Sequence, residues 1–586
     1  MPYFKHFQDA LHGLLRIAAV TLVVMGRSEA GEPPRSDASD TPLPGVVRSP
    51  LPMNKIEGRP LALVFYDLQG TAGITGGDDR ARLEIEEAFG IRAGMAFNIR
   101  LMEIGLLRVQ KLPFVRDASC RTYESGRPGH VVLVLSVTLG PKDAVAGPRG
   151  MMTGRAEDLP VLFQNERSML RLNVDGGFGL FADYNPWFGN TPAFTGQSPV
   201  AVDPADGDRA TWFEAFVEYG PAGVVQVGDG PVWVYGALTW LTSFSSGQDL
   251  FRSDTRNRTE VENAYGGVVF QPPNSDWVFN ASAGRQSWQL NDGFLFSEFA
   301  AAANAGPMPA LYLNPRTAYE MTGLFRAKRR GFQLEAFYLD PSEIDFLDSN
   351  TAFAGINLSQ QFTGGWEGSV AYYECVDSDT TFTRDNTASI PREGQQTANL
   401  RVSTTRLFSL EGLEGTAEGA YQTSRDVDWD AWAYYARIGY TFGALPWEPN
   451  LSYRYASFSG DDPSSSAYER FDAPLSSGLD DWVQGIVAKK VVSNSNLDSH
   501  RVRLNLVPHK SLSFTFDYFY LMANEPAGGA HEYAQEADLG IRWSINRNLF
   551  FLGVAGIAFP GDRLKEQSGG DLDTWSTLQA SLFWAF

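Results

Sequence analysis

The sequence predicts an all-β transmembrane barrel of about 16–18 antiparallel strands, preceded by a small α+β domain of order β-α-α-β-β. Three observations predict it. From residue 161 to 586, apolar and polar residues alternate with a period of two. Short turns alternate with long polar connections in the same region. After residue 30, no apolar run reaches the roughly 18 residues that a membrane-spanning helix needs.

The first thirty residues have the layout of a secretory signal. Basic residues precede the apolar run Ile17–Met25, and Ser28-Glu29-Ala30 forms a small-x-small cleavage site. A buried helix of a cytoplasmic protein is the alternative, and it is disfavoured because no helical pattern follows the run. Residues 31–60 are rich in Pro, Ser, Asp and Gly, so we expect a flexible linker after a signal peptide over residues 1–30.

Residues 61–140 predict the small α+β domain, with a second linker over 141–160. Asn98 is the expected N-cap of its second helix. A turn is expected at Ser125–Gly129, before the last strand. The expected elements, in chain order, are a strand at Leu61–Leu68, helices at Asp79–Phe89 and Asn98–Val109, and strands at Val115–Tyr123 and Val131–Leu139.

This segment resembles a POTRA domain, the periplasmic module found before outer-membrane barrels. The resemblance rests on Gly94, the helix leading to Leu107 and Leu112, Phe114-Val115 and the strand Val131–Leu139. An unrelated α+β module is the alternative, because many small domains share this element order. The resemblance implies that a strand edge binds partner peptides by β-augmentation.

The barrel region gives its clearest alternation near the end of the chain. In Arg501–Val507, apolar Val502, Leu504 and Leu506 alternate with Arg501, Arg503 and Asn505. Strands with one apolar and one polar face need a lipid-facing outside and a wet inside. Similar strands are expected at Ser511–Tyr520, Glu536–Ile545, Tyr319–Phe325 and Phe332–Tyr338; short turns at Pro508–Lys510, Asn546–Asn548 and Lys328–Gly331; and long loops at Ser459–Asp481 and Asn524–Ala534.

The chain closes on one more alternating strand, Trp575–Phe586. Its terminal phenylalanine, Phe586, is similar to the signal by which the barrel assembly machinery recognises outer-membrane barrels. A soluble sandwich or propeller with this edge strand is the alternative, and it is disfavoured because a long aromatic edge invites aggregation. We therefore expect outer-membrane lipid to surround the barrel of a Gram-negative bacterium, with the N-terminal domain in the periplasm.

Three segments of the barrel region resemble the alginate-export family of outer-membrane channels. They are Gly284-Arg285-Gln286 with Leu290–Gly293, within a strand expected over Ala283–Gly293; Leu451–Asp462; and Glu469–Pro474 followed by Asp481-Trp482. The resemblance implies a monomeric barrel of about 18 strands that passes an anionic polysaccharide outward. A POTRA-like domain is not part of this family pattern.

Arg330-Gly331-Phe332 matches by letters the Arg-Gly-Phe motif of POTRA-bearing insertases and two-partner secretion transporters. In those proteins, the motif lies at the tip of a long loop inside the barrel. Here only a short connection separates two alternating strands, so we interpret the match as a turn that uses the conformational freedom of glycine.

Arginines on the predicted inner face are the candidate substrate path, because guanidinium groups bind carboxylates and stay charged. Serial weak contacts with them would guide an anionic polymer. The alternative is that they pair with acids on the same faces, such as Glu320, Glu335, Asp517, Glu536 and Asp538, and brace the wall. The candidates are Arg171, Arg285, Arg326, Arg437, Arg454, Arg501, Arg503 and Arg542.

The remaining composition excludes several classes. A net charge of -21 disfavours nucleic-acid binding. Two distant cysteines, Cys120 and Cys375, exclude a disulfide framework, and six scattered histidines show no metal-ligand spacing. We predict no cofactor and no enzyme activity, since no nucleophile–base pair is supported.

Three functions stay open. The first is a polysaccharide export channel served by periplasmic polysaccharide-synthesis or scaffold proteins through residues 61–140. The second is a diffusion or uptake porin for small acidic solutes. The third is a protein secretion or insertion factor. A continuous arginine-lined path with a gating loop or plug favours the first.

Overall fold

The computed structural model describes residues 61–140 and 161–585, together with Ile56 and Arg59. Several predicted features lie outside the described residues. They are the signal peptide, both linkers apart from Ile56 and Arg59, the turn Ser125–Gly129, Gly94 and Phe586. The gaps inside the described ranges are 71–76, 94, 96, 113, 125–130, 165–166, 197, 229, 274, 299–306, 363, 385–387, 477–481, 510, 527–528 and 547.

The N-terminal domain has the expected element order. Strand β3 lies in the middle of its sheet, parallel to β1 and antiparallel to β2. Asn98 caps the second helix as predicted, because its Oδ1 accepts the Leu101 N–H at 3.0 Å. Assignment to the POTRA class stays a prediction. The elements are β1 (Leu61–Gln69), α2 (Gly77–Phe89), α3 (Ile99–Lys111), β2 (Val115–Glu124) and β3 (Val131–Leu139).

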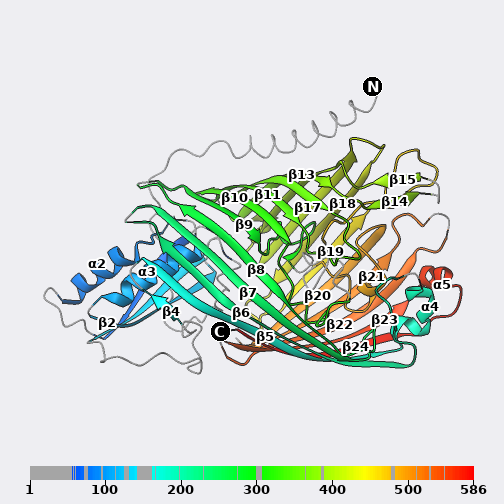
Figure 1. Ribbon diagram of the computed structural model, residues 1–586, viewed down its shortest axis with the longest axis horizontal. Helices are drawn as coiled ribbons and strands as arrows, with labels where there is room; N and C mark the ends of the chain where they lie inside the picture. Colours follow the sequence, from blue (N-terminus) through cyan, green and yellow to red (C-terminus); the bar gives the residue numbers. More distant parts are fainter. Residues whose placement is uncertain are drawn as a thin grey trace. The chain divides into compact units, whose positions relative to one another are not determined.

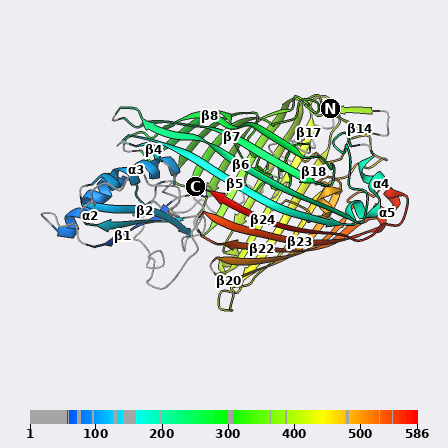
Figure 2. The same cartoon turned by 60° about the horizontal axis from the view of Figure 1, so that its bottom comes forward.

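Within the described residues, eighteen antiparallel strands close into a barrel, which confirms the predicted fold class (Figure 1). Neighbouring strands follow one another along the chain, and β24 pairs with β5 to close the ring (Figure 2). A short strand, β4 (Val161–Gln164), adds to β5. The eighteen are β5 (Ser168–Tyr184), β6 (Arg209–Gln226), β7 (Val232–Gly247), β8 (Arg256–Phe270), β9 (Val278–Arg285), β10 (Met321–Arg329), β11 (Phe332–Asp340), β12 (Ala352–Gln361), β13 (Trp366–Asp377), β16 (Gln395–Thr404), β17 (Leu413–Ser424), β18 (Ala431–Thr441), β19 (Asn450–Phe458), β20 (Leu497–His509), β21 (Leu512–Met522), β22 (Glu532–Ser544), β23 (Leu549–Pro560) and β24 (Trp575–Ala585).

The pleat sorts the side chains of each strand onto two faces, as the alternation predicts. Exposed apolar residues line up across strands on the outer face: Tyr453, Val502 and Tyr518 occupy paired positions in β19, β20 and β21. The polar residues between them face inward. An apolar outside and a polar inside are what a lipid-embedded barrel requires. No helix in the described part of the chain is long and apolar enough to span a membrane.

The two ends of the barrel differ in the lengths of their connections. At the near rim, where β5 begins, turns are short: Arg330 and Gly331 alone join β10 to β11, with φ of 44° and 86°. Positive φ at both positions is typical of a tight hairpin turn, which agrees with our interpretation of Arg330-Gly331-Phe332. At the far rim the connections are long. They include 185–208, 286–320 and 459–496.

One predicted strand is wrong in its extent. The strand expected over Ala283–Gly293 ends at Arg285, where β9 ends. The apolar residues beyond it, including Trp288 and Leu290, are buried inside the barrel and do not face lipid. Alternation alone cannot distinguish a lipid-facing position from one buried inside the barrel, because an apolar side chain is favoured at both.

The short elements of the far rim were not predicted. They are the helices η3 (Pro186–Gly189), α4 (Thr191–Thr195) and α5 (Asp562–Ser568), and a hairpin of β14 (Thr381–Arg384) and β15 (Ala388–Pro391).

Candidate functional site

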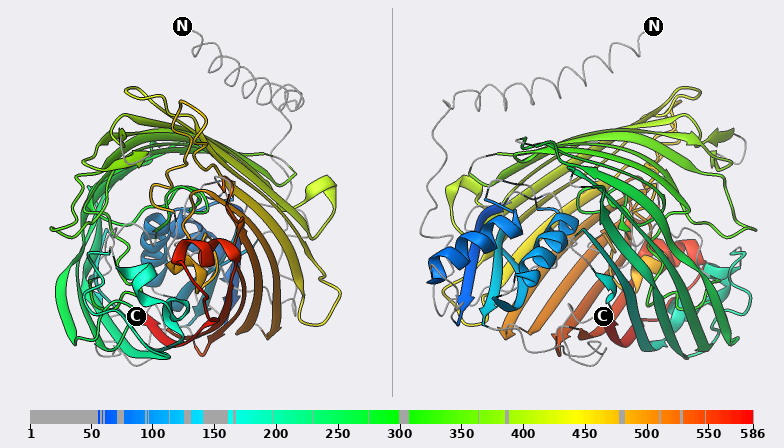
Figure 3. Two further views of the ribbon diagram at one scale, coloured as in Figure 1. Left: turned by 90° about the vertical axis from the view of Figure 1, so that its right-hand side faces the viewer. Right: turned by 60° about the vertical axis from the view of Figure 1, so that its left-hand side comes forward.

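Two far-rim connections fold into the barrel. We name them loop A (residues 286–320, described except 299–306) and loop B (residues 459–496, described except 477–481). They pair with each other: Ser297 N–H donates to Leu475 O at 2.8 Å, and Leu475 N–H to Leu295 O at 3.1 Å. The view along the barrel in Figure 3 shows chain inside the ring of strands. Loops A and B therefore occupy part of the lumen, and we name the paired loops the plug.

Aromatic side chains form the centre of this plug. Phe294 of loop A packs against Trp482 of loop B and Tyr435 of the wall, with ring centroids 4.7 and 5.2 Å apart. Phe296 packs against the wall residue Tyr373 at 4.8 Å. These rings are buried, and their packing contributes about 0.5–1.5 kcal/mol per pair beyond area burial.

Three buried wall glutamates hold the backbones of the loops. Each accepts hydrogen bonds from two consecutive backbone N–H groups. Glu214 takes those of Tyr312 and Leu313, both at 2.9 Å. Glu262 takes those of Thr317 and Ala318 at 2.8 and 2.9 Å. Glu536 takes those of Val487 and Ala488 at 2.7 and 2.6 Å. The wall thus positions both loops through backbone groups.

A buried ion pair adds a further anchor. Lys490 Nζ of loop B lies 2.7 Å from Asp183 Oδ2 of β5, and both side chains are almost fully buried. Trp575 Nε1 donates to the same carboxylate at 3.0 Å, and the Thr577 hydroxyl donates at 2.5 Å. Lys490 also lies over the rings of Trp575 and of Tyr312 in loop A, at 4.8 and 5.8 Å. This contact links both loops to the closing seam of the barrel.

Three of the predicted arginines form a row across the wall, which we name the arginine ladder. Arg437 of β18 pairs in register with Arg454 of β19, which pairs with Arg501 of β20. Like charges directly opposite one another destabilise a sheet unless they are compensated. The arginine ladder therefore lowers the stability of the sheet unless neighbouring groups compensate its charges.

Those partners come from the wall and from loop B. Arg437 pairs with Glu414. The guanidinium of Arg454 lies 4.2 Å from the ring centroid of Trp482, a cation–π contact. Arg501 Nε lies 4.0 Å from Asp517 Oδ1, and Arg503 holds the same carboxylate with two hydrogen bonds at 2.7 and 2.8 Å. Arg454 and Arg501 are each only 1% exposed, and Trp482 of loop B covers the Arg454 guanidinium.

Apart from Arg503, the other predicted arginines lie away from the ladder. Arg326 pairs with Glu335, and Arg285 with Glu320 and, at 2.8 Å, with Ser342 Oγ. Arg542 lies over the Phe550 ring at 4.9 Å, and Arg171 lies near the beginning of β5. Pairing within the wall, which the sequence left as the alternative, therefore holds for several of these side chains.

Sequence reasoning missed loop residues that build the plug. Asp292 of loop A accepts a hydrogen bond from Tyr435 Oη at 2.6 Å, and Arg401 Nε lies 3.6 Å from Glu418 Oε2 beside it. Glu214, Glu262 and Lys490 were not singled out either. The available signal was the aromatic density of Trp288–Phe296, which a solvated loop does not need. Among the described residues, no cluster of His, Cys, Asp and Glu could hold a metal ion.

A closed barrel with a lipid-facing exterior and a polar, loop-filled interior defines an outer-membrane β-barrel channel protein. The family model described as alginate export matches residues 243–575, more than half of the chain. The protein belongs to the alginate export family. No curated protein matches it significantly.

Several solved structures match the chain at low similarity. Pseudomonas aeruginosa OccK7 (OpdD) is 11% identical with a TM-score of 0.43, covering 71% of this chain and 98% of that one. A BenF-like porin from Pseudomonas fluorescens Pf-5 is 12% identical with a TM-score of 0.43, covering 71% and 98%. Salmonella typhi OmpF, in complex with daunomycin, is 13% identical with a TM-score of 0.35 and the same coverage.

Proposed function

We propose that this outer-membrane channel translocates an anionic polysaccharide from the periplasm to the cell exterior. The observation that carries the proposal is the arginine ladder. Three guanidinium groups stand opposite one another on adjacent strands of the inner wall. Such a row costs stability, and weak serial contacts with the carboxylates of a moving polymer would account for its presence.

The plug adds the second part of the proposal. Loop B covers Arg454 through Trp482, and loops A and B bind each other across the interior. We infer that this arrangement is a closed state and that export requires at least loop B to move away from the ladder. A ladder exposed only on opening would bind polymer without leaving a permanent pore in the outer membrane.

The proposal also gives roles to the ends of the chain. Residues 61–140 would lie in the periplasm and bind polysaccharide-synthesis or scaffold proteins. The C-terminal strand would be recognised by the barrel assembly machinery. In this proposal the protein acts in transport.

The diffusion porin for small acidic solutes is the main rival. Both functions use a cationic path, but a polymer channel binds long chains more tightly than single units. Planar-bilayer conductance separates them. Polyuronate is expected to block the channel, whereas neutral dextran of the same length is not. Equal block by both polymers would contradict anion selectivity, and passage of monomers with no effect of polyuronate would favour the porin.

The protein secretion or insertion factor is the third candidate. Its test is binding of extended peptides to the full-length chain. A β2-edge variant that loses peptide binding and leaves polyuronate block intact would favour that function for the N-terminal domain.

A further inference from the structure

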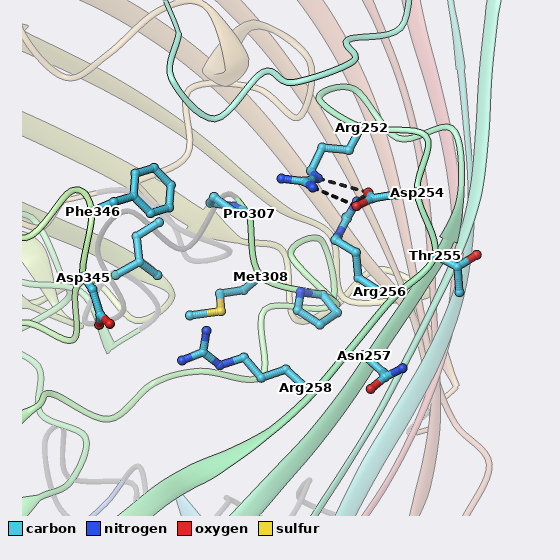
Figure 4. Close-up of a pocket in the computed structure, with 12 residues that line it drawn as sticks. Arg252, Asp254, Thr255, Arg256, Asn257, Arg258, Pro307, Met308, Asp345 and Phe346 are labelled. Atoms are coloured by element: carbon cyan, nitrogen blue, oxygen red, sulfur yellow. Dashed lines mark hydrogen bonds and ion pairs between the residues drawn. The ribbon is translucent and has the colours of Figure 1, made fainter.

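A cavity of about 490 Å³ opens at the far rim, between three connections of the barrel. Its wall comes from the β7–β8 connection with the start of β8, from loop A at residues 307–309, and from the β11–β12 connection. This volume lies within the ~300–1,000 Å³ usual for small-molecule sites. The cavity does not include the arginine ladder (Figure 4).

Two of the three arginines at this cavity are neutralised by their own loop. Arg252 holds Asp254 with hydrogen bonds at 3.0 and 2.7 Å, and Arg256 reaches Asp254 at 2.7 Å and Asp249 at 2.5 Å. Asp249 also accepts the backbone N–H groups of Phe251 and Arg252. These contacts make the arginines part of a rigid loop and leave them little capacity for a ligand.

Arg258 differs from them. Its Nε lies 3.2 Å from Glu260 Oε2, but Glu260 is shared with the buried Arg316, whose Nε is 2.5 Å from Oε1. Within the described part of the chain, Glu260 is the only ion-pair partner of Arg258, whose side chain is 51% exposed. Figure 4 shows its guanidinium pointing away from Arg252 and Asp254, toward Met308. One guanidinium edge is therefore open to an anion.

The opposite side of the cavity carries the two other features of a sugar site. Phe346 is a large aromatic side chain that is 63% exposed, and Met308 adds apolar surface. Asp345 lines the cavity and takes part in no ion pair among the described residues. Aromatic faces pack on the C–H face of a sugar ring, and a carboxylate accepts hydrogen bonds from hydroxyls.

We propose that this cavity binds one sugar unit that carries a carboxylate. Arg258 binds the carboxylate, Phe346 packs on the ring and Asp345 accepts sugar hydroxyls. The inference deepens the proposed function, since it places an acidic-sugar subsite where a polymer would leave the barrel. It does not depend on the arginine ladder, because none of the ladder residues lines the cavity.

The test is calorimetry of the full-length protein in detergent with a tetrauronate, and with maltotetraose as a neutral probe of equal length. R258Q and F346A are each expected to weaken tetrauronate binding about tenfold, the usual effect of losing a charge-assisted or stacking contact. The matched controls are R330Q and F408A, because both residues are exposed and lie at the near rim. Both controls are expected to bind like the wild type.

Unchanged affinity in both R258Q and F346A, or equal binding of maltotetraose by the wild type, would overturn the subsite. A parallel assay of polyuronate release from liposomes separates this inference from the proposed function. Loss of binding in R258Q without any polyuronate release from wild-type liposomes would support the subsite and contradict export. Release that depends on Arg454, with R258Q binding normally, would support export and remove the subsite.

Discussion

Lys490 and Asp183 lie 307 residues apart in the chain, yet their charged groups meet at 2.7 Å inside the barrel. This pair fixes loop B to the first long strand of the ring, next to the seam where β24 closes it. Because the pair is buried, removing one of its two residues leaves the other charge without a partner. This costs far more stability than breaking a surface ion pair. Substitution of Lys490 or Asp183 is therefore expected to perturb the plug.

K490M should open the plug. It leaves the buried Asp183 side chain without its ion-pair partner, which destabilises the closed arrangement by roughly 3–5 kcal/mol. We expect a larger open fraction in single-channel recordings. The double variant D183N/K490M should recover most of the closed state, because neither charge is left. The control K565Q removes an exposed pair with Asp562 and should behave like the wild type. Identical gating in K490M and wild type would contradict the anchor.

Substitution of a wall glutamate should loosen only the loop segment whose backbone it binds. An amide in place of a carboxyl group removes one of its two acceptor oxygens, and leaving a buried N–H without its acceptor costs about 1–3 kcal/mol. E536Q should therefore speed hydrogen exchange at the amides of Val487 and Ala488 roughly 10–100-fold, and leave those of Tyr312 and Leu313 unchanged. E214Q should give the reverse pattern. Uniform change at all four amides would show that these residues act on the whole barrel instead.

The arginine ladder should set polymer affinity. R454Q and R501Q are each expected to weaken polyuronate block of the open channel by about tenfold, since each removes one bidentate carboxylate donor. Block is best measured in the K490M background, where the ladder is more often uncovered. R425Q is the control, because Arg425 is exposed and pairs with Glu374 outside the ladder. Polyuronate block that is unchanged by both ladder substitutions would remove the main support for an anionic substrate.

G485A should release the segment that Glu536 holds. Gly485 has φ of +83°, and an added Cβ would lie 2.5 Å from the Glu536 carboxyl carbon. The left-handed backbone alone costs about 1–2 kcal/mol for a residue with a side chain. We expect faster hydrogen exchange over residues 486–488 and a larger open fraction. G443A is the control, since a Cβ added at Gly443 would meet nothing within 4 Å and the φ there is not positive. Normal exchange in G485A would contradict this account.

Much of the barrel could be predicted from the chain alone. Strand pairs such as β20 with β21 follow from alternation and a short turn, because both are set by residues close together in sequence. The inward side of Arg454 and Arg501 follows from the same period. Their position opposite one another does not, because register across the loop B connection depends on how the whole sheet closes.

The plug could not be predicted from the sequence. Trp288 was predicted on a strand that it does not join, and no pattern in the sequence indicated that Phe294 and Trp482 pack against each other. The sequence by itself determined the period, the short and long rims and the inward arginines, since these depend on local geometry. Only the tertiary structure decided that loops A and B fill the lumen and that Lys490 meets Asp183. Those contacts join segments that no periodicity relates, and their energy is gained only once the ring has closed.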